Sequence, residues 1–488
     1  MKHLRILLIV AALVNALVLL FLLARSPEEP DKDGDLGAVL QPLVDDATMA
    51  SARYDLRDQA ARTNIIVISM DALRMDRTGL GGHKGGLTPN LDRLGEESVV
   101  FTQAMSAASW TLPSHMSMWT SRWPSVHRVT NKLSLLGQGQ MADTTLSPGI
   151  ETFPRLLSEA GWKAAAFTGG AGVSGRFGFN RGFETYIDDR PFAGLDYSAP
   201  LAIDWLRAHK DEHFFLFLHG YDSHGQHPLP ESIIRSIPYA GPLKGDIEEQ
   251  AALREQGLAN IKAPGDDASL QGAVGPADAA FLAAVYDRKV QQADERLGAF
   301  LDEVRAMGLL ENTLVVVVSD HGDEFLEHGA LDHGHTLFEE QLHTVFLMRV
   351  PGYARNQQVD AVVRSVDLFP TIFDLLGLTV PPGVNGESLL PLLRGEEGAR
   401  LAYAETDYRL FVHRRAIRDG KYKLVIDLQD GERRLFDLSA DPAEQVDISS
   451  GEPRRTYELE QALKRWMTDH GSNPQDYLGI RQDPIEIF

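Results

Sequence analysis

The residues best suited to take part in chemistry are Asp320 and His321, which closely follow a β-branched run. Residues 313–318 read Thr-Leu-Val-Val-Val-Val, and Ser-Asp-His-Gly comes next. Such an uncharged run is typical of a strand buried on both faces of a parallel sheet. Ligands bind at the carboxyl edge of these sheets, and a carboxylate beside an imidazole suits a divalent metal ion. The stretch predicts a metal site, and its plainer alternative is a strand that ends in a polar turn.

Two other strand patterns end in groups that could join this site. Residues 64–70 form a second apolar run, which ends at Asp71. Residues 213–219 form a third, followed by Asp222 and His224. Each group alone fits a cap or a surface charge, but the carboxyl ends of parallel strands meet at one edge. The three ends together predict a single constellation.

Composition excludes several functional classes. The chain of 488 residues carries a formal net charge of -22, which argues against nucleic acid as a partner. It contains no cysteine, so disulfides and thiolate chemistry are excluded. Its length accommodates one large α/β domain and a smaller one.

The N-terminus predicts a membrane anchor. Residues 6–24 are apolar except for Asn15, and at about 1.5 Å per residue they approach the roughly 30 Å of a bilayer core. Lys2 and Arg5 precede the run, so the positive-inside rule places the rest of the chain outside the cytoplasm. We expect an uncleaved signal anchor and a periplasmic or extracellular catalytic domain. A cleaved signal peptide is the alternative.

The rest of the chain alternates strand and helix patterns, which predicts a doubly wound, mostly parallel α/β sheet. Residues 240–275 are rich in Gly, Ala and Asp, and we expect a loop there. Residues 109–115 resemble a proline-stiffened loop that feeds a helix. We predict an anchor over 1–24, a linker over 25–62, a catalytic domain over 63–395 and a small C-terminal α+β subdomain over 396–488.

An ordered set of short motifs resembles the sulfatases of the alkaline phosphatase superfamily. The motifs are Thr-Pro-Asn-Leu-Asp-Arg-Leu at 88–94, Thr-Leu-Pro-Ser-His at 111–115, Tyr-Asp-Ser-His at 221–224, Ser-Asp-His-Gly at 319–322 and Val-Asp-Leu-Phe-Pro-Thr at 366–371. The segment Arg-Asp-Gly-Lys-Tyr-Lys at 418–423 is similar to part of the sulfatase C-terminal subdomain. The resemblance spans about residues 63 to 450.

This resemblance implies roles for particular residues. Asp71, Asp320 and His321 match the metal ligands of the family. Thr111 stands at the position of the nucleophile, which also contacts the metal. His224 and His333 match positions that face the anionic group of the substrate, with His335 as the alternative to His333.

The chain departs from arylsulfatases at four places. Threonine at 111 cannot be oxidised to formylglycine, so we expect no such cofactor. Ala72 stands where arylsulfatases have a second aspartate. Residues 166–170 lack the lysine and histidine of the corresponding arylsulfatase segment, and His115 replaces the usual arginine.

The resemblance implies a membrane-anchored, metal-dependent hydrolase of sulfate, phosphate or phosphonate esters, with one divalent ion (calcium, or zinc or manganese). The expected substrate is a small anionic ester or an envelope glycan or lipid. Two alternatives remain: a transferase of phospho groups to an envelope acceptor, and a binding protein that kept the fold but lost catalysis. Because a threonine ester must be cleaved at its central atom, we expect phosphate or phosphonate esters to react faster than matched sulfates.

Overall fold

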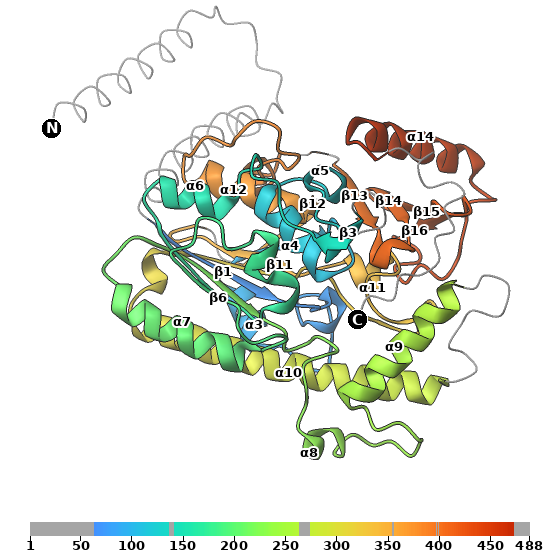
Figure 1. The fold of residues 1–488 in the computed structure, drawn as a ribbon, viewed down its shortest axis with the longest axis horizontal. Coiled ribbons are helices and arrows are strands. Elements are labelled where there is room, and N and C mark those ends of the chain that lie inside the picture. Colours follow the sequence, from blue (N-terminus) through green and yellow to red (C-terminus); the bar gives the residue numbers. More distant parts are fainter. Residues whose placement is uncertain are drawn as a thin grey trace, which may run out of the picture. The chain divides into compact units, whose positions relative to one another are not determined.

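The computed structural model describes residues 63–135, 141–262, 274–353, 356–396, 398 and 400–472. Its main feature is an eight-stranded mixed sheet (Figure 1). In spatial order the strands are β12 (Gln357–Arg364), β2 (Val99–Met105), β11 (Phe346–Arg349), β8 (Thr313–Val318), β1 (Asn64–Met70), β7 (Phe214–Gly220), β5 (Lys163–Phe167) and β6 (Thr185–Ile187). Only β11 runs antiparallel to its neighbours. The sequence-based expectation of a mostly parallel sheet is therefore confirmed.

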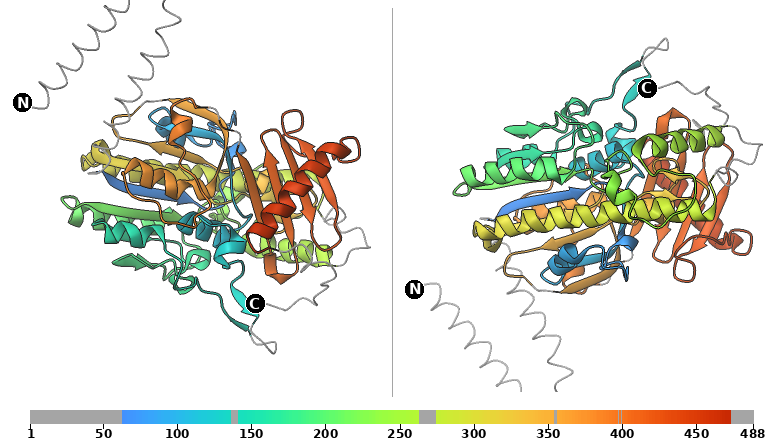
Figure 2. Two further views of the ribbon diagram at one scale, coloured as in Figure 1. Left: turned by 90° about the horizontal axis from the view of Figure 1, so that it is seen from above. Right: turned by 90° about the horizontal axis from the view of Figure 1, so that it is seen from below.

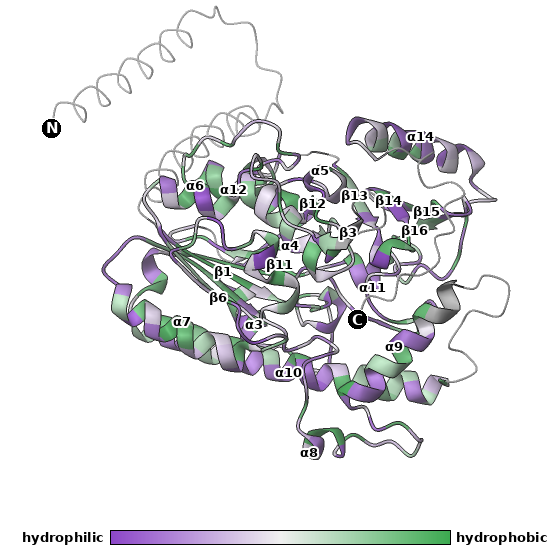
Figure 3. Ribbon diagram, in the orientation of Figure 1, coloured by the Kyte–Doolittle hydropathy of each residue, from purple (hydrophilic) through white to green (hydrophobic). Residues whose placement is uncertain are grey.

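The central strand β1 explains why the sheet is covered on both faces. Ile65 and Val67 belong to one hydrophobic cluster, whereas Ile66 and Ile68 belong to a second one. Side chains alternate between the faces of a strand, so each face of β1 buries apolar groups. Figure 3 shows this strongly apolar character along the central strands.

Helices cover the two faces as the doubly wound arrangement requires (Figures 1 and 2). The first cluster includes residues of α4 (Thr111–Thr120), α6 (Phe153–Glu159) and α12 (Leu368–Leu375). The second includes residues of α3 (Pro89–Gly95), α7 (Leu195–His209) and α10 (Pro276–Ala306). The sheet edge that carries the strand ends is thus held between two packed helical layers.

Two local expectations were wrong. A helix, α9 (Ile247–Lys262), lies inside the segment that we expected to be a loop. Its sequence is rich in good helix formers such as Ala, Glu, Gln and Leu. It lacks a clear apolar face, which is the pattern by which an amphipathic helix is predicted. In addition, Thr111 to His115 are helical rather than looped, because Pro113 sits in the first turn of α4, where a helix tolerates proline.

The C-terminal part forms a four-stranded antiparallel sheet packed against one helix. The strands are β13 (Leu401–Thr406), β14 (Arg414–Asp419), β15 (Tyr422–Asp427) and β16 (Arg433–Asp437), and the helix is α14 (Pro453–Asp469). The sequence predicted a small α+β subdomain in this part of the chain. Leu459, Leu463 and Trp466 of α14 are buried in a cluster with residues of this sheet.

A buried charge cluster links this sheet to the main domain. The Nζ atom of Lys423 lies 2.9 Å from Glu339 Oε1 and 3.1 Å from Glu444 Oε1. Burial raises the pKa of Glu444 from 4.5 to about 7, although Lys423 partly opposes that shift. Between these two pH values the folded state holds more protons than the unfolded state.

We therefore expect the Glu444 contribution to the free energy of unfolding to fall as pH rises from about 4.5 to about 7. Glu444→Gln removes this titration, and the decline should become shallower by on the order of 1 kcal/mol. Chemical denaturation at pH values of about 4.5 and about 7 measures this change in the free energy of unfolding. Substitution of the exposed Glu432 by Gln is the matched control. A decline as steep as that of the wild type would contradict the expectation.

The predicted anchor over residues 6–24 and the linker over 25–62 lie outside the described residues. Of the helices in the described part of the chain, none is both long and apolar enough to cross a membrane.

Candidate active site

The metal-ligand candidates meet at the carboxyl edge of β1 and β8. These strands pair in parallel with Ser69 opposite Val318, so Asp71 and the segment after β8 leave the sheet side by side. Ligand atoms of Asp71, Asp320 and His321 all lie within 4.8 Å of one another. The three side chains are fully buried. The structure therefore brings together the three residues that the resemblance assigns to the metal, whereas Asp222 pairs with Arg296 instead.

The carboxylates of this cluster accept fewer hydrogen bonds than their oxygen atoms could. Asp71 Oδ1 and Asp320 Oδ2 are buried and have no hydrogen-bond partner among the residues that the structure describes. Burial, followed by the negative charge of Asp320, raises the pKa of Asp71 well above its ordinary value. Burial acts on Asp320 in the same direction, but His321 and His115 outweigh it and lower the pKa of that carboxyl. Two such oxygens fit a cation, which would compensate both charges.

Thr111 presents its hydroxyl to the same cluster from the start of α4. Its Oγ1 lies 3.3 Å from Nε2 of His321. The next turn is fixed to the metal-ligand segment, because Ser114 Oγ donates a 2.7 Å hydrogen bond to the Asp320 carbonyl. Gly172 packs so closely that a Cβ there would lie 2.7 Å from Thr111 Cγ2. The hydroxyl is thus held in one place beside the carboxylates.

His224 and His333 are buried beside the cluster. Their ring centroids are 4.8 Å apart, and the His333 ring is 4.2 Å from that of His321. His335 is instead directed to Glu324, with 3.2 Å between Nε2 and Oε2. The geometry favours His333 over His335 as the site histidine.

The two site histidines differ in charge. Burial lowers the pKa of His224 well below its ordinary value, and the nearby His333 lowers it further. Burial also acts against charge on His333, but Asp332 and Asp323 outweigh it and raise its pKa well above the ordinary value. Nδ1 of His333 lies 2.6 Å from Oδ1 of each carboxylate. The site thus combines a neutral and a cationic imidazole.

Two histidines that the sequence did not assign lie behind the carboxylates. His219 Nε2 is 3.2 Å from Asp71 Oδ2, and His115 Nδ1 is 3.3 Å from Asp320 Oδ2. His115 also bonds Ser69 Oγ through Nε2 at 2.8 Å. His219 ends a strand that the sequence predicted, so its position was the available signal. The contact of His115 with Asp320 depends on how α4 packs against the sheet, which could not be predicted from the sequence.

Lys289 supports the loop that carries His224. This buried side chain reaches from α10 and donates 3.0 Å hydrogen bonds to the carbonyls of His224 and Gly225. Burial lowers its pKa to about 8. The contact ties the longest helix of the second layer to a candidate site residue.

Ala72 occupies a strained backbone position beside the cluster. Its φ is +58°, in the left-handed region that alanine rarely adopts. Its N–H donates a 3.1 Å hydrogen bond to Asp320 Oδ1, and its carbonyl accepts one of 2.7 Å from Tyr286. The backbone at position 72 therefore fixes one carboxylate, whereas its methyl side chain offers no metal ligand.

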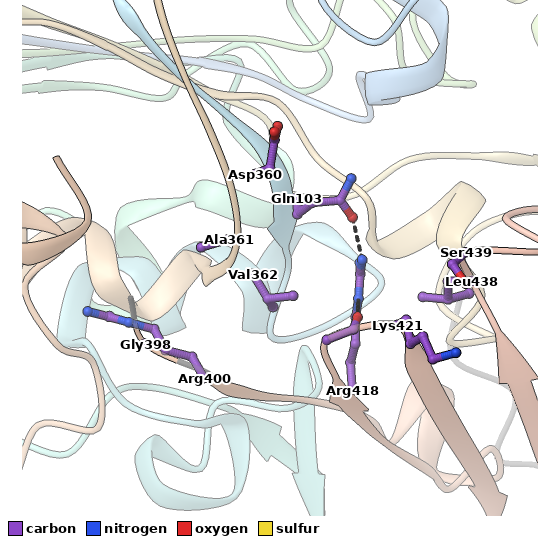
Figure 4. Close-up of a pocket in the computed structure, with 11 residues that line it drawn as sticks. Gln103, Asp360, Ala361, Val362, Gly398, Arg400, Arg418, Lys421, Leu438 and Ser439 are labelled. Carbon is purple, nitrogen blue, oxygen red and sulfur yellow. Dashed lines mark hydrogen bonds between the residues drawn. The ribbon is translucent and has the colours of Figure 1, made fainter. Parts of the chain in front are cut away.

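A separate cleft of about 400 Å³ lies between β12 and the C-terminal sheet (Figure 4). It contains none of the predicted site residues. Its basic side chains already have partners: Arg418 binds Gln103 and Glu339, Lys421 binds Asp437, and Arg400 donates to the Ser388 carbonyl. These contacts leave the strand-end cluster as the candidate active site.

Comparison with known proteins identifies the family of the chain. The profile of the Sulfatase family matches residues 63–378, and that of the N-sulphoglucosamine sulphohydrolase C-terminal region matches residues 326–472. The chain belongs to the sulfatase family, within the alkaline phosphatase superfamily.

Individual relatives vary in how much of their length is matched. Arylsulfatase K of Mus musculus is 31% identical over 200 residues, which cover 38% of this chain and only 35% of that protein. Delta 4,5-hexuronate-2-O-sulfatase of Bacteroides thetaiotaomicron is 23% identical over 86% of this chain and 90% of its own.

Two solved structures share the fold. The structure of BT4656 in complex with its substrate D-glucosamine-2-N,6-O-disulfate has a TM-score of 0.69 at 22% identity, covering 84% of this chain and 99% of that one. The phosphonate monoester hydrolase of Agrobacterium radiobacter has a TM-score of 0.67 at 20% identity, covering 84% of this chain and 96% of that one.

Proposed function

We propose that this protein is a metal-dependent hydrolase of phosphate, phosphonate or sulfate esters that uses Thr111 as its nucleophile. The observation that carries the proposal is a buried hydroxyl 3.3 Å from His321, in a cluster where two carboxylate oxygens have no hydrogen-bond partner among the described residues. Membership of the sulfatase family and the names of the relatives support this reaction class. The preference for phosphorus over sulfur as the central atom of the ester is part of the same proposal.

Asp71, Asp320, His321 and the Thr111 hydroxyl are the groups that would hold a divalent ion. Three oxygen donors and one imidazole nitrogen suit calcium, zinc or manganese. When bound, such an ion would neutralise the carboxylates and act as a Lewis acid toward oxygen atoms in the site.

In the first step Thr111 Oγ1 gives up its proton to solvent and bonds to the central atom, while the bond from that atom to the ester oxygen breaks. His333 is oriented through Nδ1 by Asp323, at 2.6 Å, and it provides positive charge for the transferred group. Neutral His224 lies beside it and can accept a proton, whereas the cationic His333 can donate one to the leaving oxygen. Water then attacks the threonine ester at its central atom and regenerates the hydroxyl.

The experiment that tests this function is a comparison of matched aryl phosphate, phosphonate and sulfate esters with the purified protein. We expect phosphate or phosphonate turnover to exceed sulfate turnover, because a phosphoryl group gives a metal and cationic side chains more charge to stabilise in the second displacement. Preference for sulfate would contradict this chemistry. No turnover of any ester, together with no affinity for a divalent ion, would favour a non-catalytic binding protein.

We further propose that residues 6–24 anchor the protein and that the catalytic domain lies outside the cytoplasm, as the flanking charges indicate. Protease added to intact spheroplasts of an expressing bacterium should then remove the domain. A cytoplasmic marker protein is the control for lysis. Protection of the domain until lysis would overturn the orientation.

A further inference from the structure

The segment that follows β5 packs against the candidate nucleophile. Residues 166–170, which lack the lysine and histidine of arylsulfatases, lead into a short 3-10 helix over Ala171–Val173. A Cβ added to Gly172 would lie 2.7 Å from Thr111 Cγ2 and 2.8 Å from Thr111 Cβ. The methyl group of Thr111 is therefore in direct contact with the backbone of residues 169–172, which we call the 169–172 turn.

Tyr221 holds the 169–172 turn in this position from the neighbouring strand end. It is buried and directly follows β7, which pairs in parallel with β5. The Tyr221 hydroxyl accepts a 2.9 Å hydrogen bond from the Gly172 N–H and donates one of 3.3 Å to the Gly170 carbonyl. The hydroxyl thus spends both its accepting and its donating capacity on the turn that contacts Thr111.

The ring of Tyr221 is itself fixed by its surroundings. Its centroid lies 4.7 Å from that of His219 and 5.1 Å from that of His224, edge-on in both cases. Gly169 packs on the ring as well, because a Cβ there would come within 2.5 Å of Tyr221 Cδ2. The Tyr221 N–H donates a 3.0 Å hydrogen bond to the Ala193 carbonyl. The hydroxyl therefore holds the turn from a defined position.

The turn adopts a backbone conformation that needs such support. Gly170 has a φ of +61° and a ψ of -135°, and Ala171 has a φ of +49°, in the left-handed region. Conformations of this kind persist when the surrounding contacts determine them. Asp188 holds the residues that follow the turn, through a 2.7 Å hydrogen bond from the Gly175 N–H. Loss of the Tyr221 hydroxyl should therefore loosen the turn locally and leave the rest of the segment in place.

The contact with Gly172 decides where the Thr111 hydroxyl lies. In a helix the χ1 angle of threonine divides between two rotamers. Thr111 is the first residue of α4, and its Oγ1 lies 3.3 Å from His321 Nε2 while Cγ2 faces Gly172. A rotation of about 120° about the Cα–Cβ bond would carry Oγ1 away from His321. The contact selects the rotamer that the reaction requires.

We infer that Tyr221 is a positioning residue for Thr111. Through the 169–172 turn its hydroxyl holds the Thr111 side chain in the rotamer that directs Oγ1 into the carboxylate cluster. The inference rests on the proposed function, in which Oγ1 attacks the ester. The effect of Tyr221 passes through the backbone at Gly172 and not through contact with the substrate.

Threonine methyl NMR of the full chain tests the rotamer without any need for turnover. With isotope-labelled methyl groups, the three-bond couplings of Cγ2 to the backbone nitrogen and carbonyl carbon report χ1. The signal that is missing from Thr111→Ser identifies Thr111. We expect the couplings of one rotamer in the wild type and couplings averaged over two rotamers in Tyr221→Phe. Unchanged couplings in Tyr221→Phe would overturn the inference.

Kinetics on the preferred ester provide a second test. Tyr221→Phe should lower kcat about tenfold with little change in KM, because the substrate still binds while Oγ1 points away in most molecules. Thr111→Ser has no methyl group for the turn to hold, so in that background the same substitution should lower kcat less than about threefold. An equal loss in both backgrounds would show that Tyr221 does not act through the methyl contact, and it would overturn the inference.

Tyr353→Phe serves as the control, because Tyr353 also donates to a backbone carbonyl, that of Leu393 at 3.0 Å. It follows β11, which runs antiparallel to β8 and ends at the edge of the sheet opposite the site. Its couplings at Thr111 and its kcat should equal those of the wild type. Averaged couplings in Tyr221→Phe, in a protein that hydrolyses no ester, would support the positioning contact and count against the proposed hydrolase. Thermal denaturation of each variant checks that it is folded.

Discussion

Asp320→Asn should abolish divalent-ion binding and reduce ester turnover by at least about a thousandfold. The substitution removes a ligand charge from a buried cluster in which Asp71 Oδ1 and Asp320 Oδ2 accept no hydrogen bond from the described residues. It keeps the shape of the side chain and an oxygen that can accept the Ala72 N–H. The loss should therefore come from the site and not from the fold.

Thermal denaturation provides a readout that does not depend on turnover. Calcium, zinc or manganese that binds the folded state raises the melting temperature of the wild type. We expect no such rise for Asp320→Asn. Asp360→Asn is the matched control, because Asp360 is exposed and bonds only Thr102 at the sheet edge. Full stabilisation of Asp320→Asn by the ion would show that the cluster is not the metal site.

Thr111→Ala should reduce turnover by at least about a thousandfold, whereas Thr111→Ser should retain a substantial part of it. Alanine removes the hydroxyl that lies 3.3 Å from His321 Nε2, and serine restores it without the methyl group that packs on Gly172. Kinetics of both variants on the preferred ester measure the effect. Thr102→Ala is a control from the same exposed pair as Asp360.

Ion-induced stabilisation separates the roles of the hydroxyl. Thr111→Ala should keep most of the rise in melting temperature, since three ligand groups remain. An active Thr111→Ala would exclude threonine as the nucleophile, and an inactive Thr111→Ser would indicate that the position serves packing alone.

Much of the fold could be predicted from local sequence. The strands β1, β7 and β8 are buried on both faces, so each shows an uninterrupted apolar run, and Asp71, Asp320 and His321 stand directly at their ends. These residues needed only the rule that parallel strands end at one edge. The antiparallel strand β11 was not predicted, because its four residues are too few to show a period.

The surroundings of the site depended on contacts that are distant in sequence. Lys289 reaches the His224 loop from a helix more than 60 residues away, and nothing in its own segment marks it as special. Arg254, which pairs with Asp332, lies on α9, a helix that was not predicted because its apolar face is weak. The charge difference between His224 and His333 arises from burial and from two carboxylates that only the folded chain brings close.

The central claim is that Thr111 forms a covalent ester with the transferred group. Rapid acid quenching during turnover of the preferred ester, followed by mass spectrometry of the peptides, tests it directly. The peptide containing Thr111 should gain the mass of the transferred phosphoryl, phosphonyl or sulfuryl group, and the adduct should be absent from Thr111→Ala. An adduct on another residue, or turnover with no adduct on any peptide under conditions that trap such esters, would contradict the account.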